Sequence, residues 1–140
     1  MPKRPEPAYL ESIGWALYSF QALEWRVVHI LKDHGHDIAK TSSKMAGQIA
    51  KGFQAAWKSD PRGTELSDAF AALVQRRNDL AHARPATMDG EDRNQRLYRW
   101  EIVRSPKKAE WVDDHWLDTF AGDVAKLSQE ISRYTTQSGD

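Results

Sequence analysis

The sequence predicts an all-α protein, an up-and-down bundle of four main helices with a small β-hairpin inserted before the last helix. Apolar residues recur at three- and four-residue steps over most of the chain, which is the period of amphipathic helices. One stretch near residue 100 alternates instead with the period of a strand. The 140 residues are enough for one domain with its own core. We expect this domain to span residues 8–134, with flexible termini at 1–7 and 135–140.

The first helix is expected from residue 8 to about residue 34, because apolar side chains recur at helical spacing and Gly35 then provides a stop. Glu24 falls within the apolar stripe of this helix. Two interpretations stay open for it. The carboxylate either reaches the surface along its own stem, or it pairs with Arg77 or His82 of a neighbouring helix.

Two further helices are expected before residue 85. Residues 41–43 (Thr-Ser-Ser) offer N-caps for a helix with one apolar face, formed by Met45, Ile49, Phe53 and Trp57. Residues 60–63 (Asp-Pro-Arg-Gly) have the composition of a turn. The next helix then begins near Glu65 and continues until Pro85, which ends it because proline lacks an amide donor.

The hairpin and the last helix follow from the remaining sequence. Residues 86–95 are polar and predict a loop, whereas residues 97–103 alternate as a strand does. A turn at 105–108 would let residues 109–112 pair back as the second strand of the hairpin. Asp113 and Asp114 then supply caps for a helix with a clean apolar stripe, which ends near residue 134.

Composition excludes several classes of protein. Lys plus Arg and Asp plus Glu both number 20, and this zero net charge argues against nonspecific coating of nucleic acid. The absence of cysteine excludes disulfides, thiol catalysis and cysteine metal sites. No apolar run is long enough to span a membrane, and the first seven residues lack the core of a signal peptide. We therefore expect a cytoplasmic protein without a membrane partner, a metal or a cofactor.

The most informative segment is residues 75–84, which closes the third predicted helix just before Pro85. In a helix, Asn78 and His82 lie four residues apart on one face, and the long side chain of Arg77 can reach the same cleft. Arginine binds phosphate through a planar fork of donors, and histidine moves protons near neutral pH. Such a pair can cleave an RNA phosphodiester without a metal. The structural alternative is a solvated arginine and a histidine that stabilises the helix dipole.

The Arg-Asn-x-x-Ala-His pattern of residues 77–82 resembles the signature of the HEPN family (higher eukaryotes and prokaryotes nucleotide-binding domains). The resemblance implies a helical bundle that commonly dimerises, so that the motifs of two protomers form one composite RNase site. It assigns Arg77 as the motif arginine, Asn78 as the adjacent polar residue and His82 as the motif histidine. Arg76 is an alternative arginine, because the family also tolerates that spacing. Some members bind nucleotides or act as scaffolds without cleaving RNA.

The sequence thus predicts a homodimeric, metal-independent endoribonuclease of the toxin or anti-phage type, with RNA as substrate and a cognate antitoxin as a candidate partner. Arg77, Asn78 and His82 are the expected catalytic residues, and Glu24 is expected to support them. The expected RNA-binding residues are Arg76, Arg84 and Arg93. The alternatives are a non-catalytic HEPN module that binds a nucleotide or a protein, and a plain helical interaction domain.

Other candidate sites are weaker. His29, Asp33 and His36 could align metal ligands, but Gly35 ends the helix before the third of them, so a polar helix C-terminus is the favoured interpretation. His115 follows the two capping aspartates and has no assigned role. Aromatic residues interleaved with arginines, Tyr98 and Trp100 among them, are typical either of a single-stranded RNA surface or of a strand with its core face, and Trp100 fits the second better.

Overall fold

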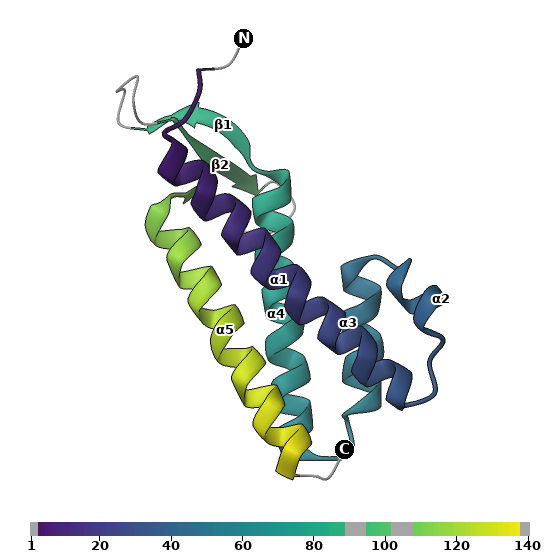
Figure 1. Cartoon of the computed structure of the whole chain (residues 1–140). Coiled ribbons are helices and arrows are strands. Elements are labelled where there is room, and N and C mark those ends of the chain that lie inside the picture. Colours follow the sequence, from purple (N-terminus) through teal and green to yellow (C-terminus); the bar gives the residue numbers. More distant parts are fainter. Residues whose placement is uncertain (1–2, 89–94, 102–107, 138–140) are drawn as a thin grey trace.

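The computed structural model describes residues 3–88, 95–101 and 108–137. This part of the chain is mostly helical and also holds a small three-stranded antiparallel sheet, so the predicted helical class with a β insertion is confirmed at this level (Figure 1). The elements in order are α1 (Pro7–Asp33), α2 (Ile38–Ser42), α3 (Ala46–Ala56), α4 (Pro61–His82), β1 (Arg84–Thr87), β2 (Gln95–Glu101), β3 (Lys108–Val112) and α5 (Asp114–Gln137).

Helix α1 follows the prediction closely. It begins at Pro7, where proline is tolerated because the first helical amide has no partner inside the helix. It ends at Asp33, and Gly35 then adopts a φ of 92°, a left-handed conformation that side chains with a Cβ rarely take. The predicted stop at Gly35 is therefore confirmed.

Between α1 and α3 the chain forms a short helix that the prediction does not include. The carboxylate of Asp37 caps α2 by accepting a hydrogen bond from the backbone N–H of Lys40 at 2.9 Å. Thr41 lies inside α2 and is buried, so the prediction that residues 41–43 cap the next helix is wrong. That helix, α3, begins at Ala46 after Met45, whose side chain is 77% exposed and does not join the apolar face.

Helix α4 begins earlier and ends earlier than predicted. Asp60 is its N-cap and accepts from the backbone N–H of Gly63 at 3.1 Å, so the expected turn at 60–63 is the first turn of the helix. The helix ends at His82 and not at Pro85. The last turn of α4 therefore ends on the motif histidine.

The sheet has one strand more than the predicted hairpin. Its order is β1-β2-β3, and both pairs are antiparallel, with Leu97 of β2 opposite Pro85 of β1 and Val112 of β3. β1 comes from residues that were predicted to end a helix and begin a loop. Pro85 is compatible with it because β1 is an edge strand, in which one row of amides needs no partner. Residues 105–107 of the predicted turn at 105–108 lie outside the described residues, and Lys108 begins β3.

Tyr9 ties the start of α1 to the sheet. Its hydroxyl accepts a hydrogen bond from the Leu97 backbone N–H at 2.9 Å and donates one to the Val112 carbonyl. The guanidinium of Arg96 lies over the Tyr9 ring, 4.4 Å from its centroid, and pairs with Asp114 at 3.1 Å. One buried phenol therefore connects α1, β2 and β3.

The main core lies where α5 packs against both α1 and α4 (Figure 1). Phe20 of α1 stands at its centre, with its ring 5.9 Å from that of Phe70 and 6.2 Å from that of Phe120. The predicted stripe of α5 is buried, but this helix continues to Gln137, so the predicted end near residue 134 is wrong. Thr135 contributes to a contact with Arg26 of α1. Among the described residues, none of the helices combines the length and the apolar character that crossing a membrane requires.

Candidate functional site

Arg77 lies at the seam between α4 and α1. Its guanidinium carbon stands 5.7 Å from the centroid of the Phe20 ring, and its Nε is buried. Among the described residues, this Nε has no hydrogen-bond acceptor. A buried donor without an acceptor costs free energy, roughly 1–3 kcal/mol and more when the group is charged. The arginine is therefore held in place by aromatic packing while part of its donor capacity stays unused.

Glu24 of α1 is the acidic group that influences Arg77. Burial raises the pKa of the Glu24 carboxyl above its ordinary value, and the positive charge of Arg77 acts in the opposite direction. The two side chains thus interact electrostatically across the α1–α4 seam, although they form no ion pair within 4.0 Å among the described residues. Of the two interpretations of Glu24, pairing with Arg77 is present only as this longer-range attraction.

Arg76, the alternative motif arginine, faces another helix. Its Nη1 lies 2.6 Å from Oδ2 of Asp123 in α5, and its guanidinium lies against the rings of Trp116 and Phe120, at 5.7 and 5.2 Å from their centroids. Neighbouring positions on a helix point about 100° apart, so Arg76 serves the α4–α5 contact while Arg77 serves the α1 side. The structure does not bring Arg76 together with Arg77 in one site.

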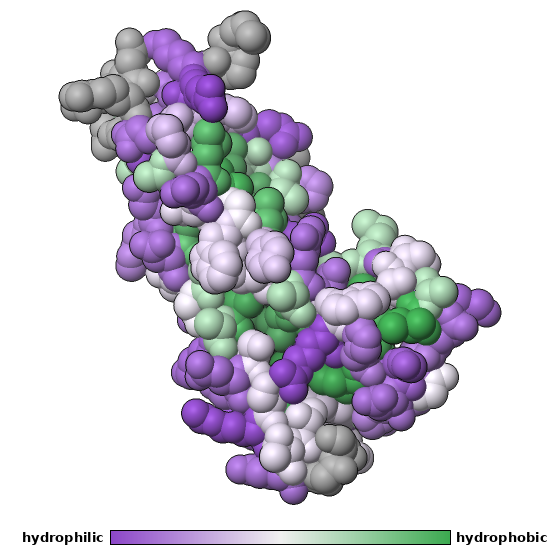
Figure 2. Space-filling view, viewed as in Figure 1, coloured by the Kyte–Doolittle hydropathy of each residue, from purple (hydrophilic) through white to green (hydrophobic). Residues whose placement is uncertain are grey.

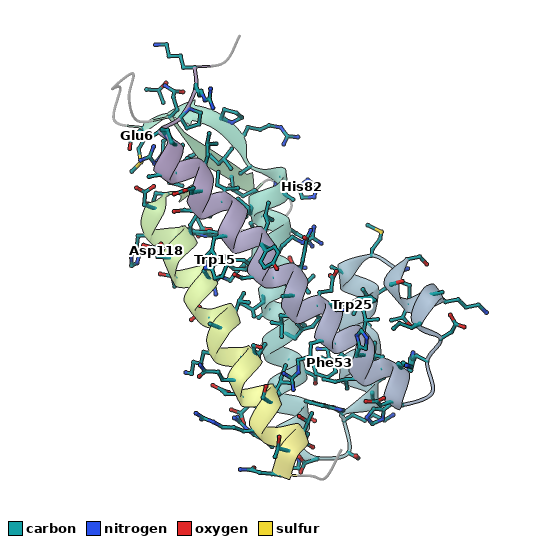
Figure 3. The ribbon with its side chains drawn as sticks, in the orientation of Figure 1. Glu6, Trp15, Trp25, Phe53, His82 and Asp118 are labelled. Atoms are coloured by element: carbon teal, nitrogen blue, oxygen red, sulfur yellow. The ribbon has the colours of Figure 1, made fainter. Side chains whose placement is uncertain are left out.

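His82 is the last residue of α4, and its side chain is exposed. Figure 3 shows it projecting from the end of the helix to the outside of the molecule. Arg84, the next predicted RNA-binding residue, is also exposed and folds back on the helix end. Its Nη1 donates to the carbonyl oxygens of His82 and Ala83 at 3.2 and 3.3 Å. Two basic side chains therefore stand together at the carboxyl end of α4, whereas Arg93 lies outside the described residues.

Asn78 and Asp79 lie between these groups. Asn78 is half-buried, four residues before His82 on the same helical face, as predicted. Asp79 pairs with Arg99 of β2 at 3.4 Å and so anchors the end of α4 to the sheet. This ion pair fixes the segment that carries the motif relative to β2, which the sequence pattern alone does not reveal.

The competing candidates receive little support. Within the described ranges, no group of three or more acidic or histidine side chains is placed to hold a metal ion, so His29, Asp33 and His36 do not converge. His115 is exposed in the first turn of α5, where Asp113 caps the helix by accepting from the Trp116 N–H at 2.8 Å. The cap prediction is therefore confirmed.

The sheet holds the aromatic residues that were considered as an RNA surface. Tyr98 packs edge-on against Trp111, with 4.8 Å between ring centroids, and both side chains are half-buried. This packing across two neighbouring strands is a structural use of Tyr98. The side chain of Trp100 lies outside the described residues.

Two features of the site were missed by sequence reasoning. Phe20 is one of the apolar residues of the first predicted helix, and its ring also supports the Arg77 guanidinium. The outer face of α1 carries exposed aromatic side chains, Trp15, Tyr18 and Trp25. The signal for the second feature was present, because these residues are spaced by three and seven residues and so share the side of the helix opposite the apolar stripe.

Comparison of the chain with models of known protein families, with curated proteins and with solved structures gave no match. The motif segment of α4 places an arginine with unused donor capacity at a helix seam, and an exposed histidine at the end of the same helix.

Proposed function

We propose that this protein is a metal-independent endoribonuclease of the HEPN type, with Arg77 and His82 as its catalytic residues. The observation that carries the proposal is the state of Arg77. Arg76, Arg96 and Arg99 each pair with a carboxylate within 3.4 Å. The buried Nε of Arg77 has no acceptor among the described residues, and its guanidinium forms no ion pair within 4.0 Å there. Because the Nε is closed to solvent, a phosphate would be bound through the two Nη atoms of the same guanidinium.

In the proposed reaction the 2′-hydroxyl of RNA attacks the adjacent phosphorus. The bond to the 5′-oxygen breaks, leaving a 2′,3′-cyclic phosphate and a 5′-hydroxyl. Arg77 stabilises the charge that develops on the phosphoryl oxygens. His82 moves a proton, either from the nucleophile or to the leaving oxygen. Asn78 lies on the same helical face as His82 and positions the substrate, and Arg84 adds positive charge at the same end of α4.

The remaining features of the HEPN type belong to the proposal as well. They are the up-and-down arrangement of four main helices, assembly into a homodimer with a composite site, and a role as a toxin or anti-phage effector controlled by a cognate antitoxin. The packing of α5 against both α1 and α4 supports the first of these. The exposed aromatic residues of α1 support assembly.

Incubation of the purified full-length chain with single-stranded RNA in the presence of EDTA tests the proposal. We expect cleavage that leaves cyclic-phosphate ends, while DNA of the same sequence stays intact because it lacks the nucleophile. A sharper control is the same RNA with one 2′-deoxy nucleotide at the cleaved position, which should resist cleavage at that site alone. Cleavage of the deoxy-substituted position, or a strict requirement for added metal, would contradict the mechanism.

A non-catalytic module that binds a nucleotide or a protein is the competing class of function. It would use the same Arg77 donor for affinity alone, and His82 would have no role in proton transfer. Such a module leaves RNA intact under every condition of the assay while still binding it or a nucleotide. Measurement of binding and cleavage in the same samples therefore separates the two classes.

A further inference from the structure

The outer face of α1 carries a regular row of side chains that the fold does not use. We call it the α1 outer stripe, and its members are Glu11, Trp15, Tyr18, Ala22, Trp25 and His29. They follow one another at steps of four and three residues, which is the spacing of a heptad seam. All six are exposed. At 100° per residue they lie opposite the buried face of α1, which includes Ala16, Phe20 and Val27.

The stripe exposes more aromatic surface than is usual for the solvent-facing side of a helix. Trp15, Tyr18 and Trp25 are 62%, 68% and 52% exposed, and the rings of Trp15 and Tyr18 stack on each other with 6.1 Å between centroids. Figure 2 shows pale and green side chains along the middle of this face, with purple side chains on either side. Figure 3 labels Trp15 and Trp25 on the same helix. Exposed aromatic patches with a polar rim are typical of protein interfaces.

We propose that the stripe is the contact between two copies of this chain, which pair through α1 in antiparallel orientation about a two-fold axis at the level of Phe20. In an antiparallel heptad seam, each position of one class faces a position of the other class. This register sets Trp15 against the partner's Trp25 and Tyr18 against the partner's Ala22.

The stripe is self-complementary in this register. The small Ala22 leaves room for the large Tyr18 ring of the other copy. At each end of the seam Glu11 faces the partner's His29, so an acid meets an imidazole and not a second acid. A parallel register would instead place Glu11 against Glu11 and stack Tyr18 on Tyr18.

The area available also fits a second copy. Burying a Trp or Tyr side chain removes about 150–250 Å² from water. With more than half of each ring exposed, the three aromatic residues of one copy supply roughly half of the ~800 Å² per partner in a standard interface. The flanking side chains of a 27-residue helix can supply the rest.

The pairing also bears on RNA cleavage, and this part of the inference rests on the proposed function. Phe20 lies on the buried face of α1, opposite the stripe, and each Arg77 guanidinium stands over the Phe20 ring of its own copy. In the pair both guanidinia therefore lie near the level of the two-fold axis but on its two outer sides, with both α1 helices between them. An RNA strand that crosses the α1 pair would meet both sites.

Measurement of molar mass across a concentration series tests the pairing without any cleavage assay. The unaltered chain should have the mass of a dimer at tens of micromolar. Ala22→Arg should raise the dimer dissociation constant at least tenfold, because it puts a charge in the centre of the seam. The matched control is Ala125→Arg, since Ala125 is an exposed alanine in the middle of α5 and its substitution should leave the dimer intact. Trp25→Ser provides a second disruptive variant if Ala22→Arg loses helix content.

Thiol cross-linking tests the orientation, because the chain contains no cysteine of its own. A tagged Tyr18→Cys chain mixed with an untagged Ala22→Cys chain should give mixed cross-linked dimers with a short bifunctional maleimide, more than either variant alone. A monomeric unaltered chain, a dimer that both disruptive variants leave intact, or stronger cross-linking of Ala22→Cys to itself would overturn the proposal. If the unaltered chain is a monomer that cleaves RNA, the pairing is overturned and the proposed nuclease activity stands. If the chain forms a dimer that depends on the stripe but does not cleave RNA, the nuclease activity is overturned and the pairing stands.

Discussion

At the scale of single residues, two adjacent arginines of α4 have different surroundings. Arg76 is bound to Asp123 and packed on two rings of α5, whereas Arg77 rests on Phe20 with its Nε unpaired among the described residues. The resemblance to the HEPN signature permits either arginine as the motif residue. The structure separates them by their partners, and this difference leads to opposite expectations for substitution.

Arg77→Gln should reduce RNA cleavage by about a hundredfold or more, the usual cost of removing one donor from an oxyanion site, while folding is retained. Arg76→Gln should leave cleavage within a few fold of the unaltered chain. It should instead lower the free energy of unfolding by up to about 1 kcal/mol, because an exposed ion pair contributes little. Cleavage rates and urea denaturation of both variants check the pair. An equal loss of cleavage in both would show that Arg77 has no special role.

Glu24 gives a pH-dependent prediction. Because burial raises the pKa of this carboxyl in the folded state, the folded chain binds a proton more readily than the unfolded chain. The associated stability is present at pH values below the ordinary pKa of glutamate and is lost as the pH rises through the raised pKa. Glu24→Gln should therefore stabilise the protein at pH 7, and the gain should shrink as the pH falls toward about 4. Urea denaturation at the two pH values measures this. A gain that grows on acidification would mean that the attraction to Arg77 outweighs the cost of burial.

At the scale of elements, the connection between α1 and the sheet depends on one side chain. The Tyr9 hydroxyl satisfies the Leu97 N–H and the Val112 carbonyl, which would otherwise be left without this partner. Tyr9→Phe should lower the free energy of unfolding by about 1–3 kcal/mol, the cost of leaving buried polar groups unsatisfied. Tyr18→Phe is the matched control, since that ring is 68% exposed and should tolerate the change. Similar free energies of unfolding for the two variants would show that the Tyr9 hydroxyl does not stabilise the connection between α1 and the sheet.

Elements with strong local signals could be predicted from the sequence, and elements that depend on distant partners could not. The helical spacing of apolar residues predicts the buried stripes of α1 and α5, and the backbone preference of glycine predicts the end of α1 at Gly35. β1 has no such signal, because its four residues become a strand only by pairing with Gln95–Tyr98. α2 is shorter than two helical turns and shows no periodicity. Its cap, Asp37, is a local signal that the apparent caps at 41–43 concealed.

The candidate site shows the same division. The motif spacing predicted that Asn78 and His82 share a face of α4, which the helix confirms. The partners of the arginines depend on the tertiary structure, because they are distant in sequence. Arg76 contacts Asp123, Arg99 contacts Asp79, and Arg77 contacts Phe20. Spacing alone therefore left Arg76 and Arg77 equivalent. Arg84 was predicted to contact RNA, and its hydrogen bonds to the end of α4 give it a structural role that does not exclude the first.

Across the whole molecule, two separate parts of the helical surface are proposed to bind two different partners. The outer stripe of α1 is assigned to a second copy of the chain, and the carboxyl end of α4 with its seam to α1 is assigned to RNA. Phe20 lies in the core on the side of α1 away from the stripe, supports Arg77 and marks the level of the proposed two-fold axis. In the proposed reaction, His82 at the end of α4 moves a proton during RNA cleavage.

Replacement of His82 by glutamine tests this proton transfer when RNA affinity and RNA cleavage are measured on the same samples. Glutamine keeps the approximate size and hydrogen bonding of histidine but cannot exchange a proton at neutral pH. His82→Gln should therefore bind RNA within a few fold of the unaltered chain, while cleavage falls by about a hundredfold or more, the scale of general acid–base catalysis. Equal losses of affinity and cleavage would instead make His82 a phosphate contact, and undiminished cleavage would contradict the account.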